Sequence, residues 1–155
     1  MTGGAKGFDP ANKPFTVGAW CRPAQGDGVV MAQGGGSQGY SLFVQDGVPQ
    51  FAVRSGGTLY SARQATKLPL NEWVHLAGQL NAHGEARLLV NGRPAATAPA
   101  APIASRPQDG FSLGADTGSF VGGYESALPW HGLLEDARVY WGEPDPDALE
   151  QWSRP

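Results

Sequence analysis

The sequence of 155 residues has few of the residues that build covalent or metal sites. Its single cysteine, Cys21, excludes an internal disulfide and a multi-cysteine metal site. The three histidines, His75, His83 and His131, lie far apart without H-x-x-H spacing, which disfavours zinc. No apolar run approaches the ~20 residues of a membrane span. The sequence therefore predicts no disulfide, no zinc centre and no membrane partner.

Positive charge is also sparse. The formal net charge is −3, and the 11 lysines and arginines are scattered along the chain. A protein that binds a phosphate backbone needs a basic stripe, so a nucleic-acid partner is disfavoured. The first ten residues, MTGGAKGFDP, have no hydrophobic stretch, and we expect no signal peptide in this chain.

Glycine and proline are abundant instead, at 23 and 13 residues, which indicates many tight turns between short strands. Strand-like segments recur every ~8 to 14 residues without intervening helices, as in an antiparallel sandwich or barrel. Asp46-Gly47 and Asn91-Gly92 predict two hairpin turns. Asp145, followed by Pro146, predicts the start of a short C-terminal helix. We expect an N-terminal extension over residues 1–14 and one β-sandwich domain over residues 15–155.

The glycine cluster at residues 34–39 matches two catalytic patterns. Gly34, Gly36 and Gly39 spell the dinucleotide fingerprint G-x-G-x-x-G, and Gly35, Ser37 and Gly39 spell the nucleophile elbow G-x-S-x-G. Both patterns work only where a helix follows. Here residues 40–44 alternate with period two, which predicts a strand, so we interpret the cluster as a glycine-rich strand connection.

Four segments, taken together, resemble a known family. FTVGAWCRP, NEWVHLAGQLN, RLLVNGRP and HGLLEDARVYWGEPDPDALEQW are similar, in this order, to the landmarks of laminin-G-like jelly-roll domains. These domains belong to the concanavalin A-like lectin/glucanase superfamily. The resemblance covers nearly all of residues 15–152 and implies an antiparallel two-sheet β-sandwich.

A narrower resemblance involves two separated stretches. VVMAQGGGSQGYSLFVQDGVPQF and FSLGADTGSFVGGYESALPWHGLLEDARVY are similar to runs in the C-terminal accessory region of certain bacterial arylsulfatases. This implies that the chain is the sandwich domain of a sulfatase or a stand-alone relative. It also implies an extracellular or periplasmic location.

Catalytic motifs of these relatives are missing. A sulfatase nucleophile needs Cys-x-Pro/Ala-x-Arg, but Gln25 stands where Cys21 would require arginine. The glucanase triplet Glu-x-Asp-x-x-Glu does not occur, because the segment that begins at Glu143 has alanine at its last position. Glu135 and Asp136 are adjacent, and in a regular strand they would point to opposite faces. We therefore expect no enzymatic activity.

The candidate ligand-binding residues lie between residues 116 and 131. They are Asp116 in a Gly/Thr/Ser loop, the aromatic residues Tyr124 and Trp130, and His131. Exposed aromatic rings could stack on a sugar face. The alternatives are that Asp116 makes an Asx-turn and that the aromatic residues close the edge of the sandwich.

One carboxylate is a candidate metal ligand. Sandwiches similar to this one often carry a calcium ion at the aspartate of the last strand, and Glu135 occupies that position here. The resemblance thus implies a structural calcium held by Glu135 and backbone carbonyls, and the alternative is an exposed row of charges.

Several further residues are expected to pack in the interior. We interpret Cys21 as a small core side chain and His75 as an inward-facing, hydrogen-bonded core histidine. Trp20, Trp73 and Trp141 alternate with core positions and are also expected to pack.

The resulting expectation is a non-catalytic accessory domain that recognises a polysaccharide or sulfated glycan. It would work with a sulfatase or another extracellular carbohydrate-active enzyme, whose catalytic domain is a second expected partner. The alternative is a structural or protein-interaction sandwich that binds no glycan, because this fold supports both roles.

Overall fold

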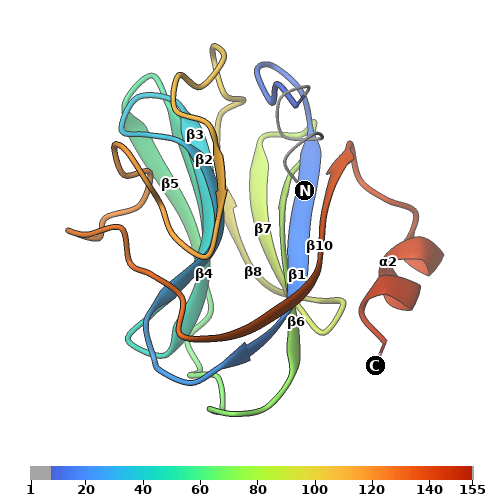
Figure 1. Cartoon of the computed structure of the whole chain (residues 1–155). Coiled ribbons are helices and arrows are strands. Elements are labelled where there is room, and N and C mark those ends of the chain that lie inside the picture. The colour runs from blue at the N-terminus through green and yellow to red at the C-terminus, as the bar shows by residue number, and fades with distance from the viewer. Residues whose placement is uncertain (1–7, 155) are drawn as a thin grey trace.

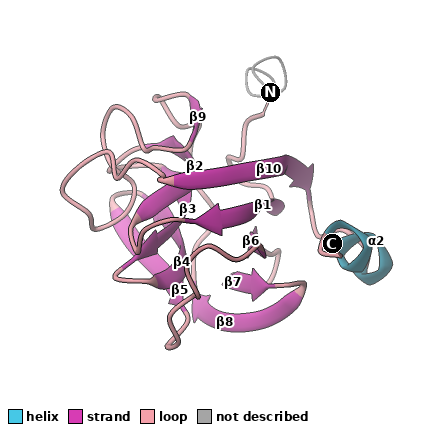
Figure 2. Cartoon of the chain, turned by 60° about the horizontal axis from the view of Figure 1, so that its bottom comes forward, coloured by secondary structure: helices cyan, strands magenta, loops and turns pink. Residues whose placement is uncertain are grey.

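The computed structural model describes residues 8–154, which form two antiparallel five-stranded sheets that pack against each other (Figure 1, Figure 2). The first sheet has the strand order β10-β1-β6-β7-β8, and the second has the order β5-β4-β3-β2-β9. A short helix, α2, lies outside the first sheet. The predicted all-β sandwich with a C-terminal helix is confirmed. The elements are β1 (Phe15–Pro23), β2 (Gly28–Gly34), β3 (Gly39–Gln45), β4 (Val48–Ser55), β5 (Thr58–Arg63), β6 (Val74–Leu80), β7 (Glu85–Val90), β8 (Arg93–Pro99), β9 (Phe111–Leu113), β10 (Gly132–Trp141) and α2 (Pro146–Trp152).

Both predicted hairpin turns are confirmed. Asp46-Gly47 joins β3 to β4 with φ angles of 54° and 79°, and Asn91-Gly92 joins β7 to β8 with 53° and 79°. Two successive residues with positive φ match the twist of the flanking strands, which is why Asp/Asn-Gly pairs occur at such turns.

The core lies between the sheets and depends on a close approach of the two layers. A Cβ atom on Gly78 of β6 would lie 2.1 Å from the ring of Phe51 in β4, so only glycine lets this ring reach the opposite sheet. Cys21 is fully buried in the same core, and burial raises the pKa of its thiol. The expectation of a small core cysteine is confirmed.

The packed unit begins before β1. Phe8 is 6% exposed and packs edge-on against Phe15 and Tyr40, with Trp141 also in ring contact. Residues 8–14 are therefore packed against the sandwich, whereas residues 1–7 of the expected extension lie outside the described residues. Trp141 remains 51% exposed and Trp73 44% exposed, so the expectation that they are core residues is wrong.

Strand β10 contains a bulge that changes which side chains share a face. Gly18 of β1 pairs with Arg138, but Trp20 pairs with Glu135, so the strand has one extra residue between these pairs. Asp136 lies in the bulge with a φ of 53°. The expectation that Glu135 and Asp136 point to opposite faces is therefore wrong, because both line one groove on the outer face.

Helix α2 covers the outer face of the first sheet. Its N-cap is Asp145, whose side chain accepts a hydrogen bond from the Asp147 N–H at 2.8 Å, as predicted. Leu149 and Trp152 bury their side chains against Ala77 and Leu89. Because α2 is a two-turn helix, this apolar contact rather than intrinsic propensity stabilises it.

His75 lies beneath this helix. Its side chain is fully buried between the rings of Trp20 and Trp152, whose centroids lie 5.4 and 4.4 Å away. It faces the outer side of the first sheet, since its neighbours Val74 and Leu76 face the core. Neither ring nitrogen has a hydrogen-bond partner among the described residues. The predicted burial is correct, but the predicted inward orientation and hydrogen bonding are wrong.

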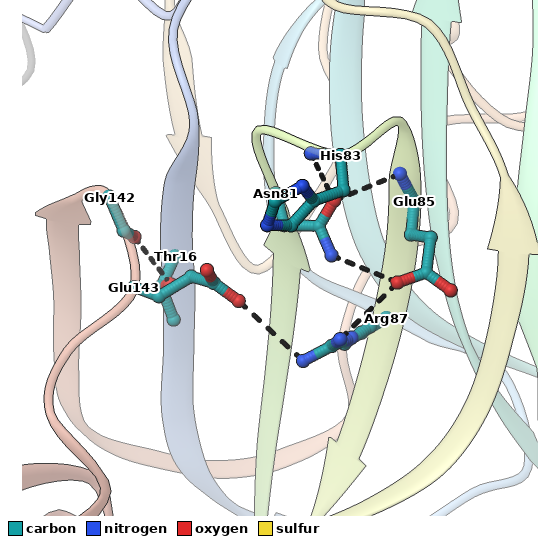
Figure 3. A network of polar contacts seen from close by, with 7 residues as sticks. All are labelled: Thr16, Asn81, His83, Glu85, Arg87, Gly142 and Glu143. Atoms are coloured by element: carbon teal, nitrogen blue, oxygen red, sulfur yellow. Dashed lines mark hydrogen bonds and ion pairs between the residues drawn. The ribbon is translucent and has the colours of Figure 1, made fainter.

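A polar network closes the opposite end of the first sheet (Figure 3). The Asn81 side chain accepts from the Glu85 N–H at 3.0 Å and donates to the Glu85 carboxylate at 3.1 Å. Arg87 pairs with Glu85 and with Glu143 beyond β10, at 3.2 and 3.5 Å. The Thr16 hydroxyl donates to the Gly142 carbonyl at 2.8 Å. These contacts fix the β6–β7 turn and attach the chain after β10 to β1 and β7.

The environment of His75 predicts acid sensitivity. Burial lowers the pKa of His75 to about 4, with nearby Asp136 raising it and Arg138 lowering it. Between pH 6.5 and 4 the unfolded chain binds a proton that the folded chain excludes, so stability falls as the pH falls through this window. We expect His75→Leu to remove about 2 kcal/mol of the loss in unfolding free energy between pH 7 and 4.5, measured by urea denaturation.

The matched control is His83→Leu, because His83 is exposed in the β6–β7 turn. This variant should keep the pH dependence of the unmodified chain. Equal pH dependence in His75→Leu and the unmodified chain would contradict the assigned role of His75.

Candidate functional site

A pocket of about 430 Å³ opens at the end of the second sheet, and we call it the rim pocket. Three segments form it: the β2–β3 turn, the connection from β8 to β9, and the chain that follows β9. Its lining is predominantly polar. The lining residues are Gly35, Gly36, Ser37, Gln38, Ser105, Arg106, Gln108, Asp109 and Ser119.

The glycine cluster allows these segments to approach one another. A Cβ atom on Gly35 would lie 1.7 Å from Ser119 Oγ and 2.9 Å from Asp109 Oδ2. Gly34 and Gly39 have φ angles of +91° and +155°, and a Gly35 N–H to Gln38 carbonyl bond of 3.0 Å closes the turn. Strand β3 follows directly, as expected. The glycines therefore serve a tight turn and a close contact.

Asp109 connects the three segments. Its Oδ2 accepts hydrogen bonds from the Ser119 hydroxyl at 2.6 Å and from the Ser119 N–H at 3.1 Å. Its backbone carbonyl accepts from the Gly34 N–H at 3.1 Å. The Gln38 side chain adds a further link by accepting from the Ala104 N–H at 3.0 Å. The walls of the rim pocket are thus held in place by hydrogen bonds within the chain.

Other polar groups of the pocket are available to a ligand. The side chains of Ser37, Ser105 and Gln108 have no hydrogen-bond partner within residues 8–154. Hydroxyl and amide groups both donate and accept, which suits a ligand rich in hydroxyl groups. Arg106, which has an interaction partner of its own, adds a permanent positive charge to the lining.

A buried pair supports the segment behind the pocket. Asp116 is 1% exposed and Tyr124 is 5% exposed. Asp116 Oδ2 accepts a short hydrogen bond from the Tyr124 hydroxyl and one of 2.8 Å from the Val121 N–H. The Tyr124 hydroxyl also lies 2.9 Å from Ser41 Oγ on β3. Burial raises the pKa of Asp116, and the hydrogen bond from Tyr124 opposes that shift. The pair attaches the β9–β10 connection to the outer face of the second sheet.

The four predicted ligand-binding residues do not meet on one surface. Asp116 and Tyr124 contact each other in the interior, as described. Trp130 is half-buried beside Gly28, and its indole Nε1 is buried with no hydrogen-bond partner among the described residues. His131 is exposed next to it, and its carbonyl accepts from the Ala24 N–H at 2.8 Å. Direct ligand contact by these residues stays a prediction.

The candidate metal ligand lies elsewhere. Glu135 is exposed on β10 and lines the groove on the outer face of the first sheet. Within residues 8–154, no group of three or more His, Cys, Asp or Glu side chains could hold a metal ion. Calcium bound by Glu135 and carbonyl oxygens stays a prediction.

Comparison with known families decides the classification. The laminin-G-like profile of the Concanavalin A-like lectin/glucanases superfamily matches residues 4–148. The chain belongs to this superfamily. No curated protein matches the chain closely enough to add a nearer relative.

Solved structures of this superfamily's fold come from several organisms. Domain 4 of AbnA, an extracellular arabinanase of Geobacillus stearothermophilus solved with arabinotriose, has a TM-score of 0.73 and 21% identity over 93% of this chain and 68% of its own. The CBM40 of a Ruminococcus gnavus sialidase, solved with sialyllactose, has a TM-score of 0.73 and 17% sequence identity; the match covers 94% of this chain and 85% of its own. A pentraxin of Limulus polyphemus has a TM-score of 0.69 and 18% sequence identity; the match covers 94% of this chain and 72% of its own. These likenesses show a shared fold.

The described part of the superfamily domain contains no helix that is both long and apolar enough to cross a membrane.

Sequence reasoning noticed the glycine cluster and Ser37 but interpreted them as a strand connection, and it missed the other residues of the rim pocket. The available signal was the narrower resemblance, because one of its stretches contains Gly35 and the other contains Ser119. The structure places these two stretches in contact. Asp109 lies outside both stretches and had no signal of its own.

A matched pair of glycine variants tests the geometry of the rim pocket. Gly35→Ala would push a methyl group into Ser119 and Asp109, and we expect it to lower the free energy of unfolding by about 1–3 kcal/mol. Gly36→Ala should change it by less than ~0.5 kcal/mol, because the nearest atom to its Cβ is 3.8 Å away. Denaturant unfolding of both variants measures this, and equal stabilities would contradict the close contact.

Proposed function

We propose that the chain is a non-catalytic glycan-recognition domain and that the rim pocket is its binding site. The observation that carries the proposal is a pocket with fixed walls and free hydroxyl and amide groups. Pre-formed polar groups lose little entropy when a ligand binds, which favours affinity. Two structures of the same fold were solved with arabinotriose and sialyllactose, which supports an oligosaccharide as the ligand class.

The narrower resemblance extends the proposal to a biological setting. We propose that the domain works beside a sulfatase or another extracellular carbohydrate-active enzyme and itself lacks catalysis. A sulfated glycan belongs to the proposed ligand class, because the resemblance is to accessory regions of arylsulfatases and Arg106 adds positive charge to the pocket lining.

A purely structural role would favour one continuous apolar patch where a partner domain packs. The exposed large hydrophobic side chains of the described residues are instead spread over both sheets and the β5–β6 connection. This distribution supports glycan recognition over a structural module. The side chains are Leu59, Leu70, Trp73, Leu113, Leu133 and Trp141.

Calorimetric titration tests the proposal. The probes are arabinotriose, sialyllactose, and neutral and sulfated galactan oligosaccharides, each titrated with calcium and with chelator. We expect saturable binding of at least one probe, and a ~3- to 10-fold loss of affinity in Gln108→Ala, since one hydrogen bond to the ligand is removed.

Gly123→Ala serves as the control, because Gly123 is exposed, does not line the pocket, and a Cβ atom there would meet nothing within 4 Å. Gly35→Ala should abolish binding because its methyl group displaces the wall at Ser119. An absence of binding to every probe would reject glycan recognition and favour the structural module. A loss of binding in chelator alone would support the predicted calcium.

A further inference from the structure

A second concave site lies on the outer face of the first sheet, and we call it the aromatic groove. Its volume is about 350 Å³, and its lining residues are Trp20, Trp73, Glu135, Asp136 and Arg154. It shares no residue with the rim pocket and consists of side chains from β1, β10, the residue before β6 and the chain after α2. Its size falls within the range of small-ligand sites.

The two tryptophan rings form its apolar surface. The indole N–H of Trp20 donates to the Trp152 carbonyl at 2.8 Å, and its ring meets His75 edge-on, so its orientation is fixed. Trp73 is 44% exposed although indole rings are usually mostly buried. The exposed ring of Trp73, beside the fixed ring of Trp20, is a surface on which the apolar face of a sugar ring can pack.

Three charged side chains line the groove, and ion pairs hold two of them, Asp136 and Arg154. The Asp136 carboxylate is bound by Arg138 through two contacts of 2.8 and 2.9 Å. Arg154 pairs with Glu150 at 2.5 Å. Glu135 makes no hydrogen bond or ion pair with any described residue, so its carboxylate remains free to accept hydrogen bonds from a ligand's hydroxyl groups.

The β10 bulge creates this combination. In a regular strand Glu135 and Asp136 would point to opposite faces, but the bulge directs both toward the tryptophans. Bulges often re-aim side chains at functional sites. Because Arg138 pairs with Asp136 and Glu150 pairs with Arg154, Glu135 is, among the described residues, the unpaired charge of the groove lining, and its negative charge disfavours an anionic ligand.

We propose that the aromatic groove binds a neutral sugar ring, with its apolar face on Trp73 and its hydroxyl groups on Glu135. The site is a second one, and the proposal rests on the proposed glycan-recognition function of the domain. It differs from the rim pocket in chemistry, since the pocket is polar and contains Arg106, whereas the groove is aromatic and acidic.

The test follows the indole N–H resonances in two-dimensional NMR spectra while xylotriose, cellotriose or sialyllactose is added. The variant Trp73→Ala identifies its own signal, and unfolding curves establish that each variant folds. Trp141→Ala is the matched control, because Trp141 is 51% exposed but lies at the other end of β10 against Phe8 and Lys13.

We expect a neutral trisaccharide to shift the Trp73 signal and to bind at least about tenfold more weakly to Trp73→Ala, with no change in Trp141→Ala. Sialyllactose should not shift this signal in the unmodified chain. The isosteric variant Glu135→Gln should keep binding of the neutral sugar, because the amide still forms hydrogen bonds, and should reduce the rejection of the acidic one.

The same spectra separate failure of this proposal from failure of the proposed function. Shifts at the rim pocket without any at Trp73 would overturn the aromatic groove alone. An absence of shifts at both sites would overturn both. A Trp73 signal that moves with protein concentration, but with no sugar, would overturn the proposal in favour of a contact between copies of this chain.

Discussion

The contact of Ser119 with Gly35 is the constraint on which the rim pocket depends. It brings two stretches together that are about 80 residues apart in the sequence, a separation that local propensity does not encode. The hydroxyl is held by Asp109, and the segment behind it is held by Asp116 and Tyr124. Position 35 requires glycine because a Cβ atom there would lie 1.7 Å from Ser119 Oγ.

The two outer faces of the sandwich are covered in different ways. On the first sheet α2 is held by apolar contacts and by two indole hydrogen bonds, from Trp20 to Trp152 and from Trp152 to the Asp136 carbonyl. On the second sheet the β9–β10 connection is held by the buried Asp116–Tyr124 pair, by packing of Tyr124 on Phe43 and by packing of Phe120 on Tyr124. The aromatic groove lies beside α2, and the rim pocket lies beside the β9–β10 connection.

Features with a local physical cause were predictable from the sequence. Asp46-Gly47 and Asn91-Gly92 define their turns through backbone preference, and Asp145 defines the start of α2 through its capping side chain. The outer position of His75 was not predictable, because its burial depends on a helix some 70 residues later in the chain. The bulge at Asp136 was not predictable either, because the alternation of apolar and polar residues along β10 does not show where an extra residue is inserted. The candidate site was only partly accessible for the same reason: its glycines were noticeable, but Asp109 acquires its role only in three dimensions.

Backbone amide chemical-shift mapping of the ¹⁵N-labelled domain with the glycan that binds tightest tests the central claim most directly. The account predicts that the largest shifts occur at Gly35–Gln38, at residues 105–109 and at Ser119, where the rim pocket lies. Large shifts confined to Trp130 and His131, or to any surface that excludes these three segments, would contradict it.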